Sequence, residues 1–540
     1  MYMECPDVVQ MDSPVFGGHQ VVLQWVREWL NKAMEANTTA SQRCPRPDLF
    51  RNQSWDNPEL TYQGCRAFVG DRRWYNDIGS RVYAWVIPVL FLLFNISLGP
   101  ADKFKLLAIV HAVGDPIDTI WSLLDKLQAW HRCYEEAAAF VEEKSVVQDA
   151  RPHEQGDMEI STQILATVFA GIEDVVGHVP GCERVYREVA EELQACDGTA
   201  LQPGGDVSNF VNPDWRRVAL HLAESRTNQL VRTFLALVVY LFAIIAEFVD
   251  QISGNGDMTP AGRIGAAMAL SFLIPITLLS NLLGTFPSRR TCLDICAGLM
   301  PEIAMRLCPD LDNGQYVMHR YFDAMSFMGS TYSFRPGKLQ RIRSASGLDR
   351  RTRLLLPWLA MLPLAFGFIP AMILHHYAAP PGFGCRHLWI LGLFATWIIS
   401  MLLTNLLQEL AYRNLNWNRT ETVFWQRRNF YFWLIYIKDL VIGVSAIVLV
   451  FLSVAGIFSN CWCWCRVLFV GERDAWLPLW YTEISQDNKR SKFPWIVAAF
   501  QACQFLYVFF IARWRRRGRR LAQWGETLKR RVWWQVHSGI

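Results

Sequence analysis

Seven stretches of this chain are apolar enough and long enough to cross a lipid bilayer. The hydrocarbon core of a bilayer is about 30 Å thick, and a helix needs about 20 mostly apolar residues to cross it. The sequence therefore predicts an all-α protein, an integral membrane bundle of about seven transmembrane helices, at residues 82–98, 230–252, 264–286, 354–377, 388–407, 431–458 and 493–512.

The remaining segments are predicted to be appendages of one membrane unit, because the hydrophobic residues, 52% of the chain, are concentrated in the apolar stretches. Two pairs of stretches form transmembrane hairpins, at 230–286 and 354–407. The formal net charge of +4 is small, so we expect the lipid bilayer and no nucleic acid as a partner. The appendages are an extracytoplasmic N-terminal segment (1–81), a helical cytoplasmic insert (99–228), a basic cytoplasmic loop (287–353), a second cytoplasmic loop (408–430), an outer cysteine-rich loop (459–492) and a basic cytoplasmic tail (513–540).

Arginine and lysine are concentrated in the loops and the tail on one side of the predicted membrane. Positive residues in short loops face the cytoplasm, so we expect the N-terminus outside and the C-terminus in the cytoplasm. The first stretch alone favours the opposite orientation, because Arg72, Arg73 and Arg81 precede it, but later charges can override a first helix. The pattern is compatible with the plasma membrane and with an endomembrane.

The outer segments carry candidate modification and ligand sites. Asn37 and Asn52 begin N-glycosylation sequons in the N-terminal segment. Oxidising conditions outside the cell favour disulfides, whereas the alternating thiols of 461–465 could bind a soft cation together with histidines of the 354–407 hairpin. Free or lipidated thiols are the third interpretation, and no cofactor is predicted. The candidate cysteines are Cys44, Cys65, Cys385, Cys461, Cys463 and Cys465.

Ionisable side chains within apolar stretches are costly in lipid and indicate function by default. Glu247 and Asp250 lie late in the second stretch, and Lys438 and Asp439 lie about two turns into the sixth. Three roles are open for them: buried pairing that holds the bundle together, passage of ions or protons, and a position at the membrane boundary.

Two asparagines close the two predicted hairpins in similar strings. Asn281 lies in Ser-Asn-Leu-Leu and Asn405 in Thr-Asn-Leu-Leu. The strings indicate either a weak parallel repeat or amide side chains that bind neighbouring helices.

The cytoplasmic insert opens with a segment that predicts a helix packed on the bundle or on the lipid surface. Asp115 suits the helix cap and Pro116 the first position. Apolar residues then recur on one face at positions 117, 120, 121, 124 and 127.

The C-terminal tail is basic and contains several tryptophans. An interfacial helix bound to anionic cytoplasmic lipids is the simplest interpretation, and docking to a protein is the alternative. Its candidate lipid-binding residues are Arg515, Arg516, Arg517, Arg519 and Arg520.

The sequence contains no zinc-protease helix, no nucleophile elbow and no nucleotide-binding loop. We therefore expect a non-catalytic membrane protein, receptor-like or scaffolding, whose basic inner loops dock a cytoplasmic protein partner. A transporter or channel that uses Glu247, Asp439 and the two hairpin asparagines is the first alternative. An outward-facing metal-handling protein is the second, and fold alone does not decide among the three.

Several strings resemble those of a group of multi-pass membrane proteins of filamentous fungi. The resemblance implies an α-helical membrane protein, and it implies no activity and no functional residues. The strings are Gly64-Cys65, Trp74-Tyr75, Gly114-Asp115-Pro116-Ile117-Asp118, Leu279-Ser280-Asn281, Ser288-Arg289-Arg290-Thr291-Cys292 and Gly382-Phe383-Gly384-Cys385-Arg386-His387.

Overall fold

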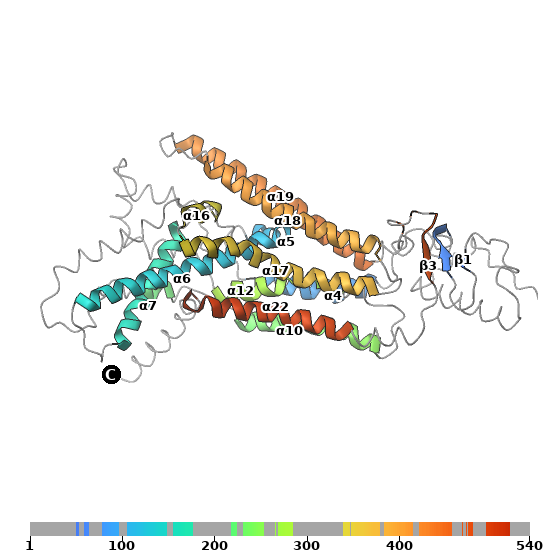
Figure 1. The fold of residues 1–540 in the computed structure, drawn as a ribbon, viewed down its shortest axis with the longest axis horizontal. Helices are drawn as coiled ribbons and strands as arrows, with labels where there is room; N and C mark the ends of the chain where they lie inside the picture. The colour runs from blue at the N-terminus through green and yellow to red at the C-terminus, as the bar shows by residue number, and fades with distance from the viewer. Residues whose placement is uncertain are drawn as a thin grey trace, which may run out of the picture.

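The part of the chain that the computed structural model describes is mostly helical and elongated (Figure 1). The described residues are 50–52, 59–63, 78–96, 105–147, 155–176, 218–223, 230–252, 265, 268–283, 338–345, 347–377, 383–413, 421–455, 467, 471, 473–478 and 493–518. Their helices are α4 (Ile78–Phe94), α5 (Lys105–Gly114), α6 (Pro116–Val147), α7 (Gln155–Val176), α10 (Leu230–Ile252), α12 (Leu273–Leu283), α16 (Lys338–Ser344), α17 (Gly347–Tyr377), α18 (Cys385–Arg413), α19 (Glu421–Ala455) and α22 (Phe493–Trp514).

Four helices of the described residues are long and apolar enough to cross a membrane by length and composition. They coincide with the last four predicted stretches, so the chain has the character of a helical membrane protein. The first three predicted spans are not among them, and the full count of seven is not shown. The four candidate spans are Gly347–His376, His387–Leu410, Trp433–Ser453 and Pro494–Trp514.

The third predicted stretch departs most from a continuous helix. Its described helix, α12, has 11 residues, which span only about 16 Å at 1.5 Å per residue. The chain entering α12 forms turns, in which the backbone N–H groups of Ser271 and Ile274 donate to carbonyl oxygens three residues earlier. Pro275 follows and has no N–H to donate. The expected helix over 264–286 is therefore interrupted near its middle.

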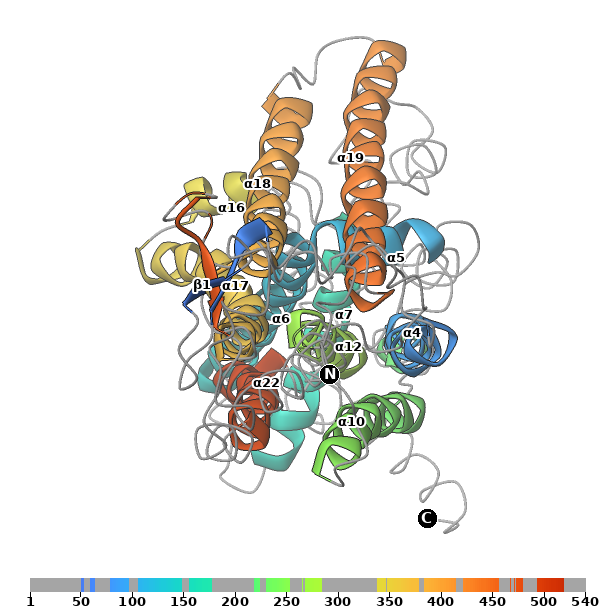
Figure 2. The ribbon, with the colours of Figure 1, turned by 90° about the vertical axis from the view of Figure 1, so that its right-hand side faces the viewer.

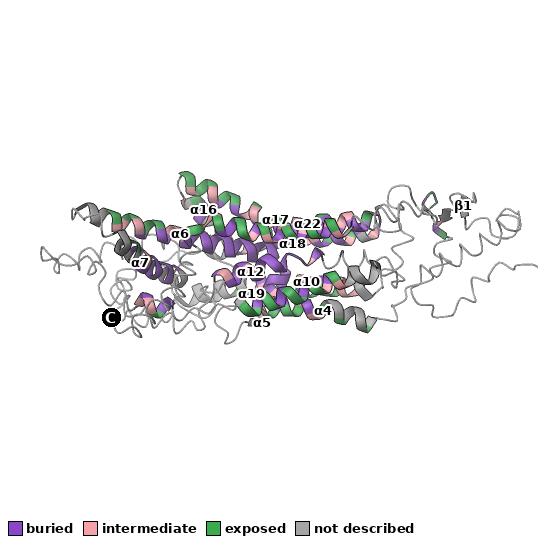
Figure 3. Ribbon diagram, turned by 90° about the horizontal axis from the view of Figure 1, so that it is seen from below, coloured by how far each residue is buried: buried purple, intermediate pink, exposed green. Residues whose placement is uncertain are grey.

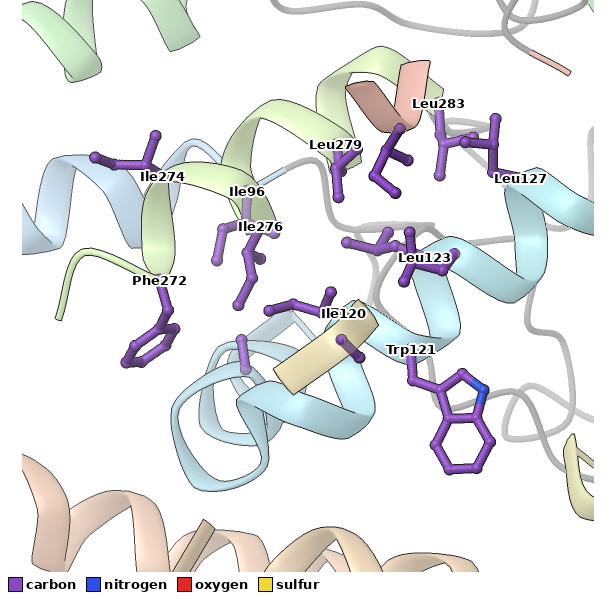
Figure 4. Packing of buried hydrophobic residues seen from close by; sticks show 14 of the residues in the cluster. Ile96, Ile120, Trp121, Leu123, Leu127, Phe272, Ile274, Ile276, Leu279 and Leu283 are labelled. Carbon is purple, nitrogen blue, oxygen red and sulfur yellow. The ribbon is translucent and has the colours of Figure 1, made fainter. Parts of the chain in front are cut away.

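Figure 2 shows α6 lying among the other helices, and α6 contacts α17, α18, α12 and α5. α19 packs along α18 and contacts α4, and α17 packs between α18 and α22. α12 contacts α22, α10 and α4. Figure 4 shows Ile120 and Leu123 of α6 facing Ile276 and Leu279 of α12. The start of the predicted cytoplasmic insert thus lies among the spanning helices.

The outward faces of the candidate spans remain apolar. On α19 the exposed side chains include Ile437, Val441 and Val444, and on α22 they include Leu506 and Phe509. Figure 3 shows green, exposed stretches along the outside of the bundle and purple, buried ones along α6. A soluble protein rarely exposes apolar patches of this extent, so the pattern agrees with helices that face lipid.

One small antiparallel sheet is an exception to the predicted all-α fold. It contains β1 (Phe50–Asn52), β2 (Glu59–Thr61) and β3 (Trp476–Pro478) in the order β1-β2-β3. Leu60 of β2 is opposite Leu477 of β3. The sheet lies at the end of the molecule opposite to α7 (Figure 1). It joins the predicted N-terminal segment to the predicted cysteine-rich loop.

Candidate functional site

A group of ionisable side chains is buried where the turn between α5 and α6, the α5–α6 elbow, enters the bundle. The side chain of Lys438 is 11% exposed, and those of the other members are at most 1% exposed. The group draws on α5, the elbow, α6, α16 and α19, and we call it the charge cluster. Its members are His111, Asp115, Asp118, Lys338, Lys438 and Asp439.

Three consecutive residues shape the elbow. Gly114 ends α5, and a Cβ at this position would lie 2.3 Å from the main-chain oxygen of Asp439, so glycine is required for the approach of α5 to α19. Asp115 caps α6, because its Oδ1 accepts a hydrogen bond from the Asp118 backbone N–H at 3.0 Å. Pro116 takes the first helical position. The cap and helix start predicted from the sequence are confirmed.

Side chains of α18 hold the elbow by its main chain. The Trp397 indole N–H donates to the carbonyl oxygen of Val113 at 2.9 Å, and the Ser400 hydroxyl donates to that of Gly114 at 3.0 Å. The last carbonyl groups of a helix have no partner within the helix. α18 therefore supplies partners for the end of α5 inside the bundle.

Lys438 connects two of the cluster carboxylates. Its Nζ lies 3.0 Å from Asp115 Oδ2 and 2.6 Å from Asp439 Oδ1. The same ammonium group donates to the hydroxyls of Ser400 and Thr404 at 2.6 and 2.7 Å. Because a buried charge is tolerated only when it is paired and hydrogen-bonded, these contacts explain how Lys438 is accommodated.

His111 lies between the carboxylates of Asp439 and Asp118. Its Nδ1 lies 2.6 Å from Asp439 Oδ2, and its Nε2 lies 3.4 Å from Asp118 Oδ2. Lys338 forms an ion pair with Asp118 and donates to Ser122 Oγ at 3.1 Å. Bases and acids therefore alternate along one connected chain of contacts, in the order Lys338, Asp118, His111, Asp439, Lys438, Asp115.

The structure brings three of the predicted site residues to this place. Lys438 and Asp439 are members of the cluster, and Asn405 adjoins it. The Asn405 amide donates to Asp118 Oδ1 at 3.4 Å and to the Met401 carbonyl at 2.8 Å. Lys438 and Asp439 are therefore buried and paired, and the three roles proposed for them stay predictions.

Asn281 lies outside the cluster but acts in a similar way. Its amide donates to the Thr277 carbonyl at 2.8 Å, four residues earlier, as Asn405 does in its own helix. It also donates to the carbonyl of Asn95, just beyond the end of α4, at 2.8 Å. Each asparagine therefore joins its helix to a second segment of the chain.

Several predicted site residues lie outside what the structure describes. Glu247 and Asp250 belong to the last turns of α10, but their side chains are not described. Asn52 ends β1, but its side chain is not described either. The residues wholly outside the described part are Asn37, Cys44, Cys65, Cys461, Cys463, Cys465, Arg519 and Arg520.

Cys385 and two buried histidines lie at the turn between α17 and α18. Cys385 is disulfide-bonded, whereas pairing of the other candidate cysteines stays a prediction. The rings of His375 and His387 lie 6.3 Å apart between their centroids. Within the described residues no group of three or more His, Cys, Asp or Glu side chains could hold a metal ion.

The described start of the basic tail contacts α6. Arg517 Nη1 lies 3.1 Å from Glu135 Oε1, and the Arg515 guanidinium stacks on the Trp514 ring at 4.0 Å. Burial, and then the neighbouring Arg515 and Arg517 charges, lower the pKa of His131 on the same face of α6. Arg516 is exposed, and lipid binding by the tail stays a prediction.

A second set of buried charges continues along α6, away from the elbow. Arg341 of α16 lies 3.3 Å from Asp125 Oδ2 and 3.0 Å from Glu173 Oε1 of α7. Arg353 at the start of α17 donates to the main-chain oxygen of Arg341 at 2.6 Å. We call these residues the inner charge set, and they join α6, α7, α16 and α17.

Sequence reasoning missed four members of the cluster, namely His111, Asp115 as a charge, Asp118 and Lys338. One signal was available. Asp118, Ser122 and Asp125 recur at helical spacing on one face of α6, and Lys338 and Arg341 recur at a spacing of three on α16. Matching acidic and basic faces of this kind predict contact between two helices.

Comparison with protein-family models, curated proteins and solved structures finds no match to this chain.

Proposed function

We propose that this chain is a non-catalytic, seven-span membrane protein of the receptor-like or scaffolding kind, in which the charge cluster couples the spanning helices to α6. The observation that carries the proposal is that one connected set of ion pairs joins α5 and α6 to α16 and α19. A displacement of α19 therefore acts directly on the root of α6.

The strand pairing supports an odd number of spans. β2 and β3 pair, so residues 59–61 and 476–478 lie on the same side of the membrane. The chain between them must therefore cross the membrane an even number of times. α17, α18 and α19 account for three candidate crossings, so at least one more is needed. Crossings by α4, α10 and the 264–286 stretch raise the number between the two strands to six, which is even. α22 follows β3 and adds a seventh crossing.

The dimensions of α6 support a role beyond the bundle. It has 32 residues, which correspond to about 48 Å at 1.5 Å per residue. Its first turn is held by the charge cluster at Asp118, and its third turn is held by the inner charge set at Asp125. A long helix that is held by charged contacts at two levels moves as one body, so its far end reports changes at its root. Under the predicted orientation, this end faces the cytoplasm and is available to a protein partner.

Spin labels test the coupling. We would introduce genetically encoded labels at exposed positions of α6 and α18, Ala139 and Leu406, and measure their separation in nanodiscs. Lys438→Met should broaden the distance distribution, because the elbow loses its ammonium partner. Arg343→Gln is the matched control, because Arg343 is 67% exposed and lies in a surface pair. A folded Lys438→Met protein with an unchanged distribution would refute the coupling.

Cysteine accessibility tests the topology. An impermeant maleimide should label single cysteines placed in 253–263 and 378–382 from the same side, and cysteines in 287–337 and 519–540 from the other. Labelling of 253–263 and 287–337 from the same side would contradict a crossing between them and thus the seven-span count.

Proton or ion transport is the second candidate function, because buried ionisable groups in a membrane bundle often form relays. The alternating chain of the charge cluster is the specific observation in its favour. Purified protein in vesicles should then dissipate an imposed pH gradient, and Asp439→Asn should abolish the flux. A wild-type rate equal to that of empty vesicles would exclude proton transport. Handling of metal at 461–465 stays a prediction, as does the fungal resemblance.

A further inference from the structure

Both ring nitrogens of His111 face carboxylate oxygens. Nδ1 lies 2.6 Å from Asp439 Oδ2, and Nε2 lies 3.4 Å from Asp118 Oδ2. An ionised carboxylate only accepts hydrogen bonds, and a neutral imidazole has a single N–H. In a neutral ring one nitrogen lone pair would therefore face an acceptor. Only the imidazolium form donates toward both carboxylates.

The charge balance of the cluster leads to the same protonation state. Three carboxylates face two ammonium groups, so the cluster carries one unbalanced negative charge when His111 is neutral. It carries none when His111 is cationic. Because an unbalanced charge is strongly disfavoured away from water, the buried cluster has an electrostatic reason to retain one proton.

Among the described residues, the charges around His111 come from the elbow, α6, α16 and α19. The elbow contributes Asp115 and α6 contributes Asp118. α19 contributes Lys438 and Asp439, and α16 contributes Lys338. α18 presents only neutral groups to the cluster, which are the hydroxyls of Ser400 and Thr404 and the amide of Asn405.

We propose that the charge cluster is a proton-binding site in which His111 holds one proton between Asp439 and Asp118. The proton is the ligand, and its loss removes the charged contacts of His111 with Asp439 of α19 and Asp118 of α6. The proton site itself follows from the cluster geometry alone. Its consequence, release of α6 from the bundle, rests on the coupling proposed above.

Nitrogen NMR of ¹⁵N-histidine-labelled protein in nanodiscs tests the site directly. The chain has 11 histidines, and the His111 signal is identified as the one absent from His111→Gln. We expect an imidazolium signal for His111 at pH 7.5, about one unit above the ordinary histidine pKa of about 6.5. His376→Gln is the control, because this exposed histidine lies outside the charge cluster and its removal should leave the His111 signal unchanged. A neutral His111 signal at pH 7.5 would overturn the proposal.

A second variant separates this proposal from the coupling. In Asp439→Asn the cluster is balanced without the extra proton, so His111 should become neutral at pH 7.5. If that variant does not fold, the wild-type signal alone decides. One outcome would confirm the proton site and refute the coupling. His111 would be an imidazolium, and the spin-label distance between α6 and α18 would not change between pH 6 and the pH at which His111 loses its proton. A neutral His111 together with a broadened distance distribution in Lys438→Met would refute the proton site and support the coupling.

Discussion

A methyl group at Gly114 should disrupt the α5–α6 elbow. The added Cβ would lie 2.3 Å from the main-chain oxygen of Asp439 and 2.8 Å from its Cα. Ordinary contacts of a Cβ begin at 3.4 Å, so α5 and α19 would have to separate by about 1 Å. The clashing atoms belong to the main chain of α19, and no rotation of a side chain relieves them. Overpacking of this kind costs about 1–3 kcal/mol.

Two other glycines provide matched controls. Gly392 of α18 has no atom within 4 Å of an added Cβ, so Gly392→Ala gains the helix propensity of alanine, at most about 1 kcal/mol. Gly443 of α19 is intermediate, because its Cβ would lie 3.3 Å from Gly114 N and Val110 O. From most to least stable, the expected order is Gly392→Ala, wild type, Gly443→Ala and Gly114→Ala.

The free energy of unfolding can be measured by titration with SDS in a fixed mixed micelle. The gain in helix propensity applies to both variants and cancels in the comparison, so we expect Gly114→Ala to be about 1–3 kcal/mol less stable than Gly392→Ala. Spin labels on α6 and α18 should show the elbow displaced in the same variant. Equal stability of the two variants would refute the close approach of α5 and α19.

Three further predictions concern single side chains. Lys338→Met should cost about 3–5 kcal/mol in the same titration because it leaves buried Asp118 unbalanced, whereas Arg343→Met should cost less than about 1 kcal/mol because its pair is on the surface; similar costs would contradict the burial. Asn281→Leu should cost about 1 kcal/mol through its lost bonds, and an unchanged unfolding midpoint would show that they contribute nothing. Burial and then the tail arginines lower the pKa of His131. Docking of the tail on α6 is therefore strongest above pH 6.5 and weakens as the pH falls through the lowered pKa. A spin-label distance between the tail and α6 should lengthen on acidification in wild type but not in His131→Gln.

The four long spans were predictable because lipid acts on composition. Any helix that faces lipid must be apolar over about 20 residues, and α17 to α19 and α22 meet that condition in sequence. The break at the third stretch was not predictable in the same way. Residues 264–272 are as apolar as a span, and only the hydrogen bonds of Ser271 and Ile274 reveal the turns. Pro275 was the one local signal of a change in the helix.

Two of the six members of the charge cluster were predictable from composition. Lys438 and Asp439 stand out because they interrupt an apolar stretch. His111 and Asp118 lie in a segment whose mixed composition is typical of a soluble insert, so their charge raised no question. The partner of Asp118 is Lys338, 220 residues later in the chain. Contacts at that separation come from the folded bundle, and their one local signal is the matching spacing of acidic residues on α6 and basic residues on α16.

The charge cluster exceeds what adhesion of the elbow requires. Trp397 and Ser400 already bind the end of α5, and Gly114 already fixes the distance to α19. Hydrogen bonds in membranes contribute only about 0.6 kcal/mol on average, and apolar replacements of buried ion pairs are often neutral or stabilising. Six ionisable groups at one elbow are therefore an inefficient way to hold two helices together. They are an efficient way to make the contact depend on charge, because a single proton at His111 decides whether the cluster is balanced.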